Sequence, residues 1–359
     1  MRSRNVFNVI KLAGAYTAFC AGSGFATGQE VMQFFTSFGF KGLMAIAVAF
    51  ILFSIIAAKA MSDGYAADVT ESDFELWSRY GGSLVGKFLQ YFTFFQFYGM
   101  FVVIVGGAGA LLQQYFGISN ITGRILLLVI CFFAVNIRMD KFINAIGAIG
   151  PFIIVFVVAV GGISMFRAEN TLRDVWFMLP TLQLTKSCSN WLLTGILYVG
   201  YTAIPLIPFL SKLSKEAGSR KTAVSAGILG SAFLLLCILA MNMAFLGNLD
   251  IIYKQEIPML VLAKRINPVL AMLFTVSMIL GIFSVSTSML RMTCVKVFRE
   301  GTSGYRVLAG VLAAAAFVLS ILPFSKLVSL FYPAFGWIGI FVMICIVVRL
   351  LGERIRKRV

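Results

Sequence analysis

Histidine is absent from the 359 residues of this chain, and charged side chains make up only 12% of them. Without histidine, the chain lacks the side chain that most often serves as general base, metal ligand and pH switch. The low charge excludes an ordinary soluble domain, which carries roughly 25% charged residues. The six cysteines occur singly and form no CxxC pair, so neither a zinc site nor a redox pair is indicated.

Acidic residues are also scarce, with 14 Asp and Glu against 30 Lys and Arg. Glu30 is the only acidic residue well inside an apolar run, so a paired-carboxylate active site is missing. We therefore expect neither enzymatic activity nor a bound cofactor. The basic residues lie between apolar runs rather than in a stripe with interleaved aromatics. They indicate membrane topology and not nucleic-acid binding.

What the chain does have is apolar sequence, since 60% of its residues are hydrophobic. Stretches of about 20 apolar residues predict an all-α polytopic membrane protein. The first stretch contains Lys11 and Glu30 and has no A-x-A-like site, so it is a retained span and not a signal peptide. The ten predicted spans are 7–37, 41–60, 86–116, 122–137, 142–166, 188–211, 221–247, 268–298, 305–323 and 326–350.

The distribution of basic residues predicts the orientation of these spans. With the N-terminus inside, 21 of the 30 Lys and Arg residues fall on the cytoplasmic side. We therefore expect a single domain, residues 1–359, in the cell membrane with both termini cytoplasmic. Two connecting segments are expected to be structured. Residues 61–85 should contain a short interfacial helix inside, and residues 250–267 a re-entrant or surface helix outside.

Two of the spans contain sequence that weakens a helix near the middle. The first has AGSGFATGQE at residues 21–30, and the sixth has GYTAIP at residues 200–205 followed by Pro208. Each glycine destabilises a helix by about 1 kcal/mol relative to alanine, and Pro205 removes a backbone hydrogen bond. Taken singly, such segments are as well explained by close packing and kinks. Their places at the start of two five-span halves favour breaks at the central site of an inverted-repeat transporter.

The GSGFATG sequence at residues 22–28, the Gly-Tyr-Thr sequence at 200–202 and the ten-span length resemble the amino acid–polyamine–organocation superfamily. Its members share the five-plus-five fold of the sodium-coupled leucine transporter. Within it, the chain is most similar to the uncharacterised YkvI-type bacterial membrane proteins. The resemblance implies two repeats, about 7–166 and 188–350, with broken helices 1 and 6, and secondary active transport by alternating access.

The resemblance and the dipoles of a broken helix together predict the site. Backbone N–H groups at the start of the outer half-helix suit a carboxylate, and carbonyls ending the inner half-helix suit a cation or ammonium. A small neutral amino acid or related zwitterion satisfies both. The third span supplies two contacts, although its aromatic run is equally explained as a packing surface. The predicted substrate contacts are Ala21, Gly22, Ser23, Gly24, Phe25, Gln96, Tyr98, Gly200, Tyr201 and Thr202.

The eighth span suggests the coupling ion. Its GIFSVSTSM segment, residues 281–289, resembles the sodium-site pattern of sodium-coupled members of this fold. Five neutral oxygens suit a hard monovalent cation. Two alternatives remain open: helical hydroxyls that only bond back to the preceding turn, and coupling to protons or to no ion. The predicted sodium ligands are the backbone carbonyls of Ala18, Ala21 and Ser284 and the hydroxyls of Thr287 and Ser288.

Glu30 has two interpretations, because a charge inside an apolar run is costly and usually functional. It could act as a gate or proton-coupling group, or it could be a first-turn carboxylate stabilised by the outer half-helix dipole. A rival to transport as a whole is a nutrient receptor that keeps the cavity without completing a transport cycle. The expected partners are a small-molecule substrate and the lipid bilayer; nothing in the sequence identifies a protein partner.

Overall fold

The computed structural model describes residues 2–67, 72–136 and 150–356, and within these ranges the chain is helical and has no strand. Six of the described helices are long and apolar enough to cross a membrane, by length and composition. They are α4 (Phe40–Ala66), α5 (Asp73–Phe116), α10 (Trp191–Leu213), α11 (Arg220–Leu246), α14 (Pro268–Val295) and α16 (Phe324–Arg356).

Shorter helices make up the rest of the described chain. Three are apolar, α6 (Asn120–Asn136), α8 (Gly150–Phe166) and α15 (Ser303–Leu319). The first predicted span is divided into α1 (Arg2–Cys20), α2 (Ser23–Ala26) and α3 (Gln29–Phe34). All these helices lie close to the predicted spans; residues 142–149 of the fifth fall outside the described residues. The connecting helices are η1 (Thr36–Phe38), α9 (Leu172–Met178), η2 (Ser214–Ala217), α12 (Leu249–Ile252) and α13 (Pro258–Ile266).

The outer faces of these helices are apolar. Ile51 on α4, Phe95 on α5 and Val155 on α8 are each more than half exposed, at 57%, 63% and 65%. In water such a surface would drive aggregation, whereas in a bilayer it meets the acyl chains. The protein is a helical membrane protein.

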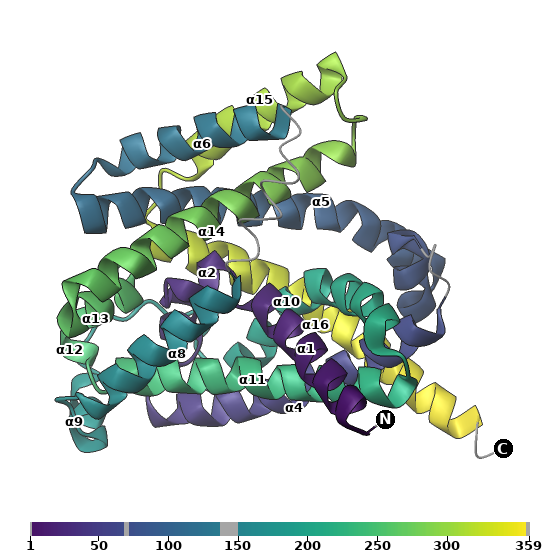
Figure 1. Ribbon diagram of the computed structural model, residues 1–359, viewed down its shortest axis with the longest axis horizontal. Coiled ribbons are helices and arrows are strands. Elements are labelled where there is room, and N and C mark those ends of the chain that lie inside the picture. The colour runs from purple at the N-terminus through teal and green to yellow at the C-terminus, as the bar shows by residue number, and fades with distance from the viewer. Residues whose placement is uncertain (1, 68–71, 137–149, 357–359) are drawn as a thin grey trace.

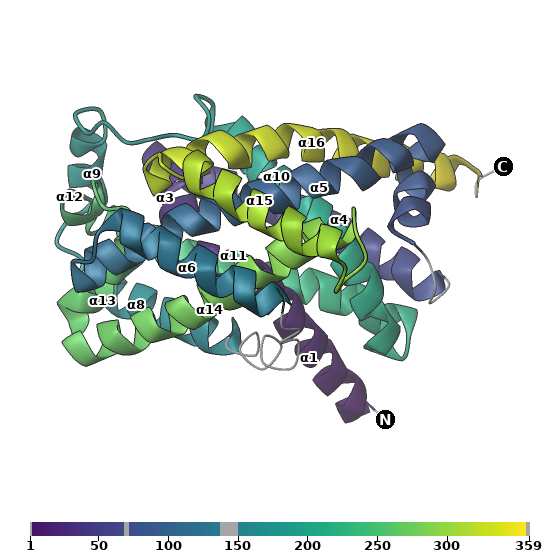
Figure 2. The ribbon, with the colours of Figure 1, turned by 90° about the horizontal axis from the view of Figure 1, so that it is seen from above.

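The helices form layers that run in one general direction (Figures 1 and 2). Helices α6 and α15 pack together at one side, and α5 and α14 lie next to them. Helix α10 lies among the remaining helices and packs along both α4 and α16. This layering places α10, α16 and the divided first segment next to one another in the centre of the molecule.

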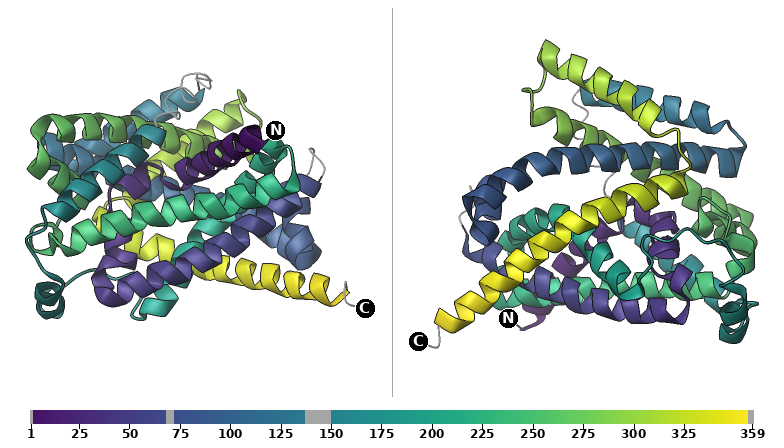
Figure 3. Two further views of the ribbon diagram at one scale, coloured as in Figure 1. Left: turned by 60° about the horizontal axis from the view of Figure 1, so that its bottom comes forward. Right: turned by 180° about the vertical axis from the view of Figure 1, so that it is seen from behind.

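The connecting segments gather at two opposite ends. At one end, Arg265 forms an ion pair with Glu169, and Asn170 donates to the carboxylate of Asp250 at 2.6 Å. At the other, Lys11 pairs with Glu216 at 3.0 Å. Both chain ends lie at this second end (Figure 3). Segments predicted for the same side of the membrane therefore meet each other; which end is cytoplasmic stays a prediction.

Two structured connections were predicted, and both contain helix. Helix α5 begins with a capping box between Ser72 and Glu75 and turns at Gly82, whose φ is +79°. Residues 73–81 are thus a short helical arm ahead of the long helix. In the segment 250–267, α13 is packed into the protein against α14 and α8 rather than lying on its surface.

The predicted break in the sixth span is wrong, because α10 runs as one helix from Trp191 to Leu213 with Pro205 and Pro208 inside it. Pro205 has no N–H to offer the carbonyl of Tyr201, one turn earlier. The side chain of Gln96 on α5 fills that place, donating from Nε2 to the Tyr201 carbonyl at 2.8 Å. A hydrogen bond from a neighbouring helix keeps the proline-containing helix continuous.

Gly200, the other element of the predicted break, serves close packing. A Cβ at Gly200 would lie 2.4 Å from the carbonyl oxygen of Gly336, and one at Gly339 only 1.8 Å from the carbonyl oxygen of Gly200. Small residues let two membrane helices approach closely. Here they bring α10 into contact with α16.

Candidate functional site

The break in the first span is confirmed, and the structure shows two interruptions instead of one. Helix α1 ends at Cys20, and Gly22 is extended, with φ −61° and ψ −180°. The chain then forms α2, a helix of four residues. Gly28, with φ +83°, separates α2 from α3. The positive φ explains the glycine at position 28, because other residues rarely adopt it.

Helix α2 has the donors that the sequence predicted. Its first helical hydrogen bond runs from the N–H of Ala26 to the carbonyl of Gly22, at 3.2 Å. The N–H groups of residues 23–25 precede that bond, as they do at every helix start. The backbone of the break is thus suited to an anionic group, as expected from the sequence.

Hydrogen bonds within the first segment and from α13 stabilise the second interruption. The hydroxyl of Thr27 donates to the carbonyl of Gly24 at 2.7 Å and accepts from the N–H of Gln29 at 3.1 Å. The N–H of Met259, at the start of α13, donates to the carbonyl of Thr27 at 3.3 Å. Helix α13 therefore covers the break on the side of the connecting segments.

Glu30 lies in the first turn of α3 and is 5% exposed. Its Oε2 accepts a hydrogen bond from the hydroxyl of Tyr201 on α10, and the hydroxyl of Tyr332 on α16 is a second partner. Its Oε1 would lie 3.3 Å from a Cβ at Gly24. The carboxylate thus joins three segments, the broken first span, α10 and α16, beside the backbone of α2.

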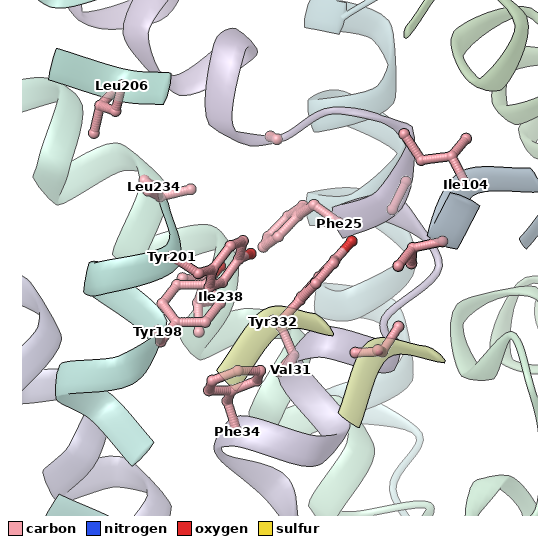
Figure 4. Packing of buried hydrophobic residues seen from close by; sticks show 14 of the residues in the cluster. Phe25, Val31, Phe34, Ile104, Tyr198, Tyr201, Leu206, Leu234, Ile238 and Tyr332 are labelled. Carbon is pink, nitrogen blue, oxygen red and sulfur yellow. The ribbon is translucent and has the colours of Figure 1, made fainter. Parts of the chain in front are cut away.

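Aromatic rings surround this carboxylate. The rings of Tyr201 and Tyr332 are stacked, with centroids 4.6 Å apart and planes inclined by 20°. The ring of Tyr198 lies 5.4 Å from that of Tyr201, edge to face. Figure 4 shows Phe25, Tyr201 and Tyr332 pointing toward one another from the broken segment, α10 and α16. Glu30 and these rings are all buried, so in this conformation the centre is shielded from solvent.

Of four further predicted contacts, one reaches this centre. It is Gln96, which donates to the carbonyl of Tyr201. Tyr98 instead donates to the carbonyl of Leu312 on α15, at 3.0 Å, and Thr202 bonds back to the carbonyl of Tyr198 at 3.0 Å. Gly200 faces α16, as described above. The structure thus assigns these three residues to packing in this conformation.

Tyr332 is the residue that the sequence interpretation missed. It stands directly before Pro333 in the last span, where a polar aromatic beside a helix-weakening residue could have marked it. The resemblance indicates site residues in spans one, three, six and eight, whereas Tyr332 lies in the tenth.

The predicted sodium ligands come from two parts of the chain. Ser284, Thr287 and Ser288 lie on α14, which packs against α2, whereas Ala18 lies on α1 and Ala21 between α1 and α2. In the structure the hydroxyl of Ser288 donates to the carbonyl of Ser284 at 2.9 Å, which is the bond back to the preceding turn. The hydroxyl of Thr287 donates to the sulfur of Cys131 on α6 at 3.5 Å. In both bonds the hydroxyl donates and keeps its oxygen lone pairs, so neither bond excludes a sodium ion, and the sodium site stays a prediction.

The fold and site define a helical membrane protein with a divided first segment around a buried carboxylate. No protein-family model matches the chain. It is 24% identical over 344 residues to the uncharacterized membrane protein YkvI of Bacillus subtilis (strain 168), which covers 92% of each chain. It is 20% identical over 333 residues to the uncharacterized protein YyaD of the same organism, 90% of this chain and 92% of that one. The predicted similarity to YkvI is confirmed.

Among solved structures, the chain is similar to a mutant of the Eremococcus coleocola manganese transporter. That similarity has 15% identity and a TM-score of 0.48, and covers 93% of this chain and 75% of the other. The same transporter in complex with an aromatic bis-isothiourea substituted compound gives a TM-score of 0.41 over 96% and 73% of the two chains. Membership of the amino acid–polyamine–organocation superfamily stays a prediction.

Proposed function

We propose that this protein is a secondary active transporter that carries a small neutral amino acid or related zwitterion across the cell membrane. The observation that carries the proposal is the divided first segment, whose Glu30 is hydrogen-bonded by side chains of α10 and α16. Irregular backbone inside a membrane protein is tolerated where it is buried in protein or lines a cavity. Alternating access would move these three elements relative to one another and so open the centre to each side in turn.

The chemistry of the centre supports a zwitterion. The N–H groups that start α2 suit a carboxylate, whereas the carboxylate of Glu30 suits a cation. Both lie near Gly24, so one small molecule with both charges fits the pair. The buried rings of Phe25 and Tyr201 support a moderately apolar side chain on that molecule.

The proposal includes ten spans arranged as two five-span repeats. The six long helices, the apolar helices α6, α8 and α15, and the divided first segment make up that number. A helix of 17 residues is about 26 Å long, close to the thickness of the hydrocarbon core. It also includes coupling to a cation, with sodium at Ala18, Ala21, Ser284, Thr287 and Ser288 as the first candidate and a proton at Glu30 as the second.

Uptake into proteoliposomes tests the proposal. The purified protein would be reconstituted, and labelled alanine, serine, valine, leucine and lysine would be offered under an inward sodium gradient, with choline in place of sodium as the control. We expect uptake of one or more neutral amino acids above that of protein-free liposomes. Specific binding of a solute with no uptake under any gradient would instead support a receptor.

A further inference from the structure

We propose that Glu30 and the stacked rings of Tyr201 and Tyr332 bind the ammonium group of the cargo. The sequence predicts that the carbonyls at the end of α1 bind a cation or ammonium group. The structure offers a second location a few residues on, built from side chains. The inference rests on the proposed transport function for the identity of the cargo, but binding at this site can be measured without transport.

The described neighbours of the Glu30 carboxylate are uncharged side chains. The hydroxyls of Tyr201 and Tyr332 form hydrogen bonds with Glu30. Cys20 and Tyr198 lie close enough to interact electrostatically with its carboxylate. Among the described residues, no lysine or arginine is one of these groups. A buried carboxylate with no cationic partner is destabilised by several kcal/mol when ionised. A cation brought by the cargo would supply the missing counter-charge.

The rings and oxygen atoms at this centre indicate which kind of cation fits. The two tyrosines whose hydroxyls reach the carboxylate, Tyr201 and Tyr332, are stacked on each other. The ring of Tyr198 meets that of Tyr201 edge to face, and the Phe34 ring is 5.9 Å from that of Tyr201. Ring faces attract organic cations such as ammonium groups. A sodium ion would need five or six oxygens, whereas the side chains at this centre present two carboxylate and two hydroxyl oxygens. The composition of the site therefore favours an organic ammonium.

The hydrogen-bond acceptors at this centre match the donors of an ammonium group. An ammonium group has three donors, and each tyrosine hydroxyl can keep donating to Glu30 while its oxygen accepts from the ammonium. The two carboxylate oxygens and the hydroxyl oxygens thus provide enough acceptors. Gly24 adds a geometric reason, because its missing side chain leaves Oε1 of Glu30 next to the backbone of α2.

The experiment measures thermal stabilisation of the purified full-length protein. The probes are methylammonium chloride, isoamylammonium chloride and potassium isocaproate, with potassium chloride at the same ionic strength as the reference. The second and third probes are leucine without its carboxylate and without its amine. We expect stabilisation by the two ammonium salts and none by isocaproate alone.

The variants identify the residues responsible. Glu30→Gln should weaken the apparent affinity for methylammonium at least tenfold, about the effect of a charge-assisted hydrogen bond. Tyr332→Leu, which removes both the ring and the hydroxyl but no charge, should weaken it about tenfold, whereas Tyr332→Phe, which keeps the ring, should weaken it less. Glu216→Gln alters an exposed carboxylate in an ion pair with Lys11 and should behave as wild type. If Glu30→Gln does not fold, Glu30→Asp and the two Tyr332 variants carry the test.

The inference is overturned if neither ammonium salt stabilises the wild-type protein, or if stabilisation survives in both Glu30→Gln and Tyr332→Leu. Stabilisation that depends on Glu30 while no amino acid is taken up by proteoliposomes would leave the ammonium site standing and remove the transport function. Uptake of amino acids by a protein that does not bind the ammonium salts would support the transport function and refute the ammonium site.

Discussion

The hydroxyl of Tyr201 on α10 donates a hydrogen bond to the carboxylate of Glu30 on α3. This bond links α10 to the divided first segment of the chain. The backbone carbonyl of the same Tyr201 accepts from Gln96 on α5. One residue therefore connects three elements, through its side chain on one side and its main chain on the other.

Gln96→Leu should destabilise the protein because it leaves the buried carbonyl of Tyr201 without a donor. We expect a loss of about 1–3 kcal/mol, measured as a lower midpoint of thermal unfolding. In a Pro205→Ala background the alanine N–H can satisfy that carbonyl, so the loss caused by Gln96→Leu should be smaller. Strictly additive effects of the two substitutions would show that Gln96 does not replace the bond that Pro205 lacks.

Gly339→Ala should disrupt the contact between α10 and α16. An added Cβ would lie 1.8 Å from the carbonyl oxygen of Gly200, so the helices must separate. Overpacking of this kind costs about 1–3 kcal/mol, which thermal unfolding in detergent would detect. Gly162→Ala on α8 is the matched control, because nothing lies within 4 Å of its added Cβ. Equal unfolding midpoints for the two variants would contradict the close packing.

The predicted sodium site is tested by Thr287→Ala combined with Ser288→Ala. We expect the pair to remove both sodium-dependent stabilisation and sodium-dependent uptake, because two of five ligands are lost. Ser277→Ala on the same helix removes an exposed hydroxyl that bonds back to Leu273 and should change neither. Wild-type uptake that ignores replacement of sodium by choline, but collapses when the proton gradient is dissipated, would favour coupling through Glu30.

The orientation of the chain is tested by reporter fusions. Fusions after Arg167 and Asn248 should report an external location, and those after Lys215 and Val359 an internal one. The structure already groups the segments of Arg167 and Asn248 at one end and that of Lys215 at the other. An external C-terminus would be incompatible with ten spans and the inverted repeat.

Much of the helical architecture could be predicted from the sequence. Apolar runs of about 20 residues match the thickness of the bilayer, and the basic residues between them separate one span from the next. The interruption at residues 21–30 was also predictable, because three glycines in seven residues resist a single helix. What failed was the break at Pro205. A proline inside a helix looks the same in sequence whether its lost hydrogen bond is replaced or not, and the replacement comes from Gln96, far away in the chain.

The candidate site was also predictable only in part, because some of its residues stand out in the sequence and others are identified only by their neighbours in the fold. Glu30 stands out as a charge in an apolar run, and Gln96 and Tyr201 meet at the centre as expected. Tyr98 and Thr202 occur in equally suggestive segments, but their hydroxyls are satisfied by carbonyls of α15 and of their own helix. The neighbours of a buried helix determine which of its faces lies at the site, and these neighbours are known only from the folded structure.

The central claim is that the broken segment around Glu30 carries a zwitterionic solute across the membrane. Counterflow tests it most directly: proteoliposomes loaded with unlabelled leucine, or whichever neutral amino acid gives uptake, are placed in a trace of the labelled compound. We predict transient accumulation of label in wild-type vesicles, loss of at least about 90% of the initial rate in Glu30→Gln, as expected from a tenfold or larger effect, and a wild-type rate in Glu216→Gln. Absence of counterflow by the wild-type protein for every neutral amino acid, or an undiminished rate in Glu30→Gln, would contradict the account.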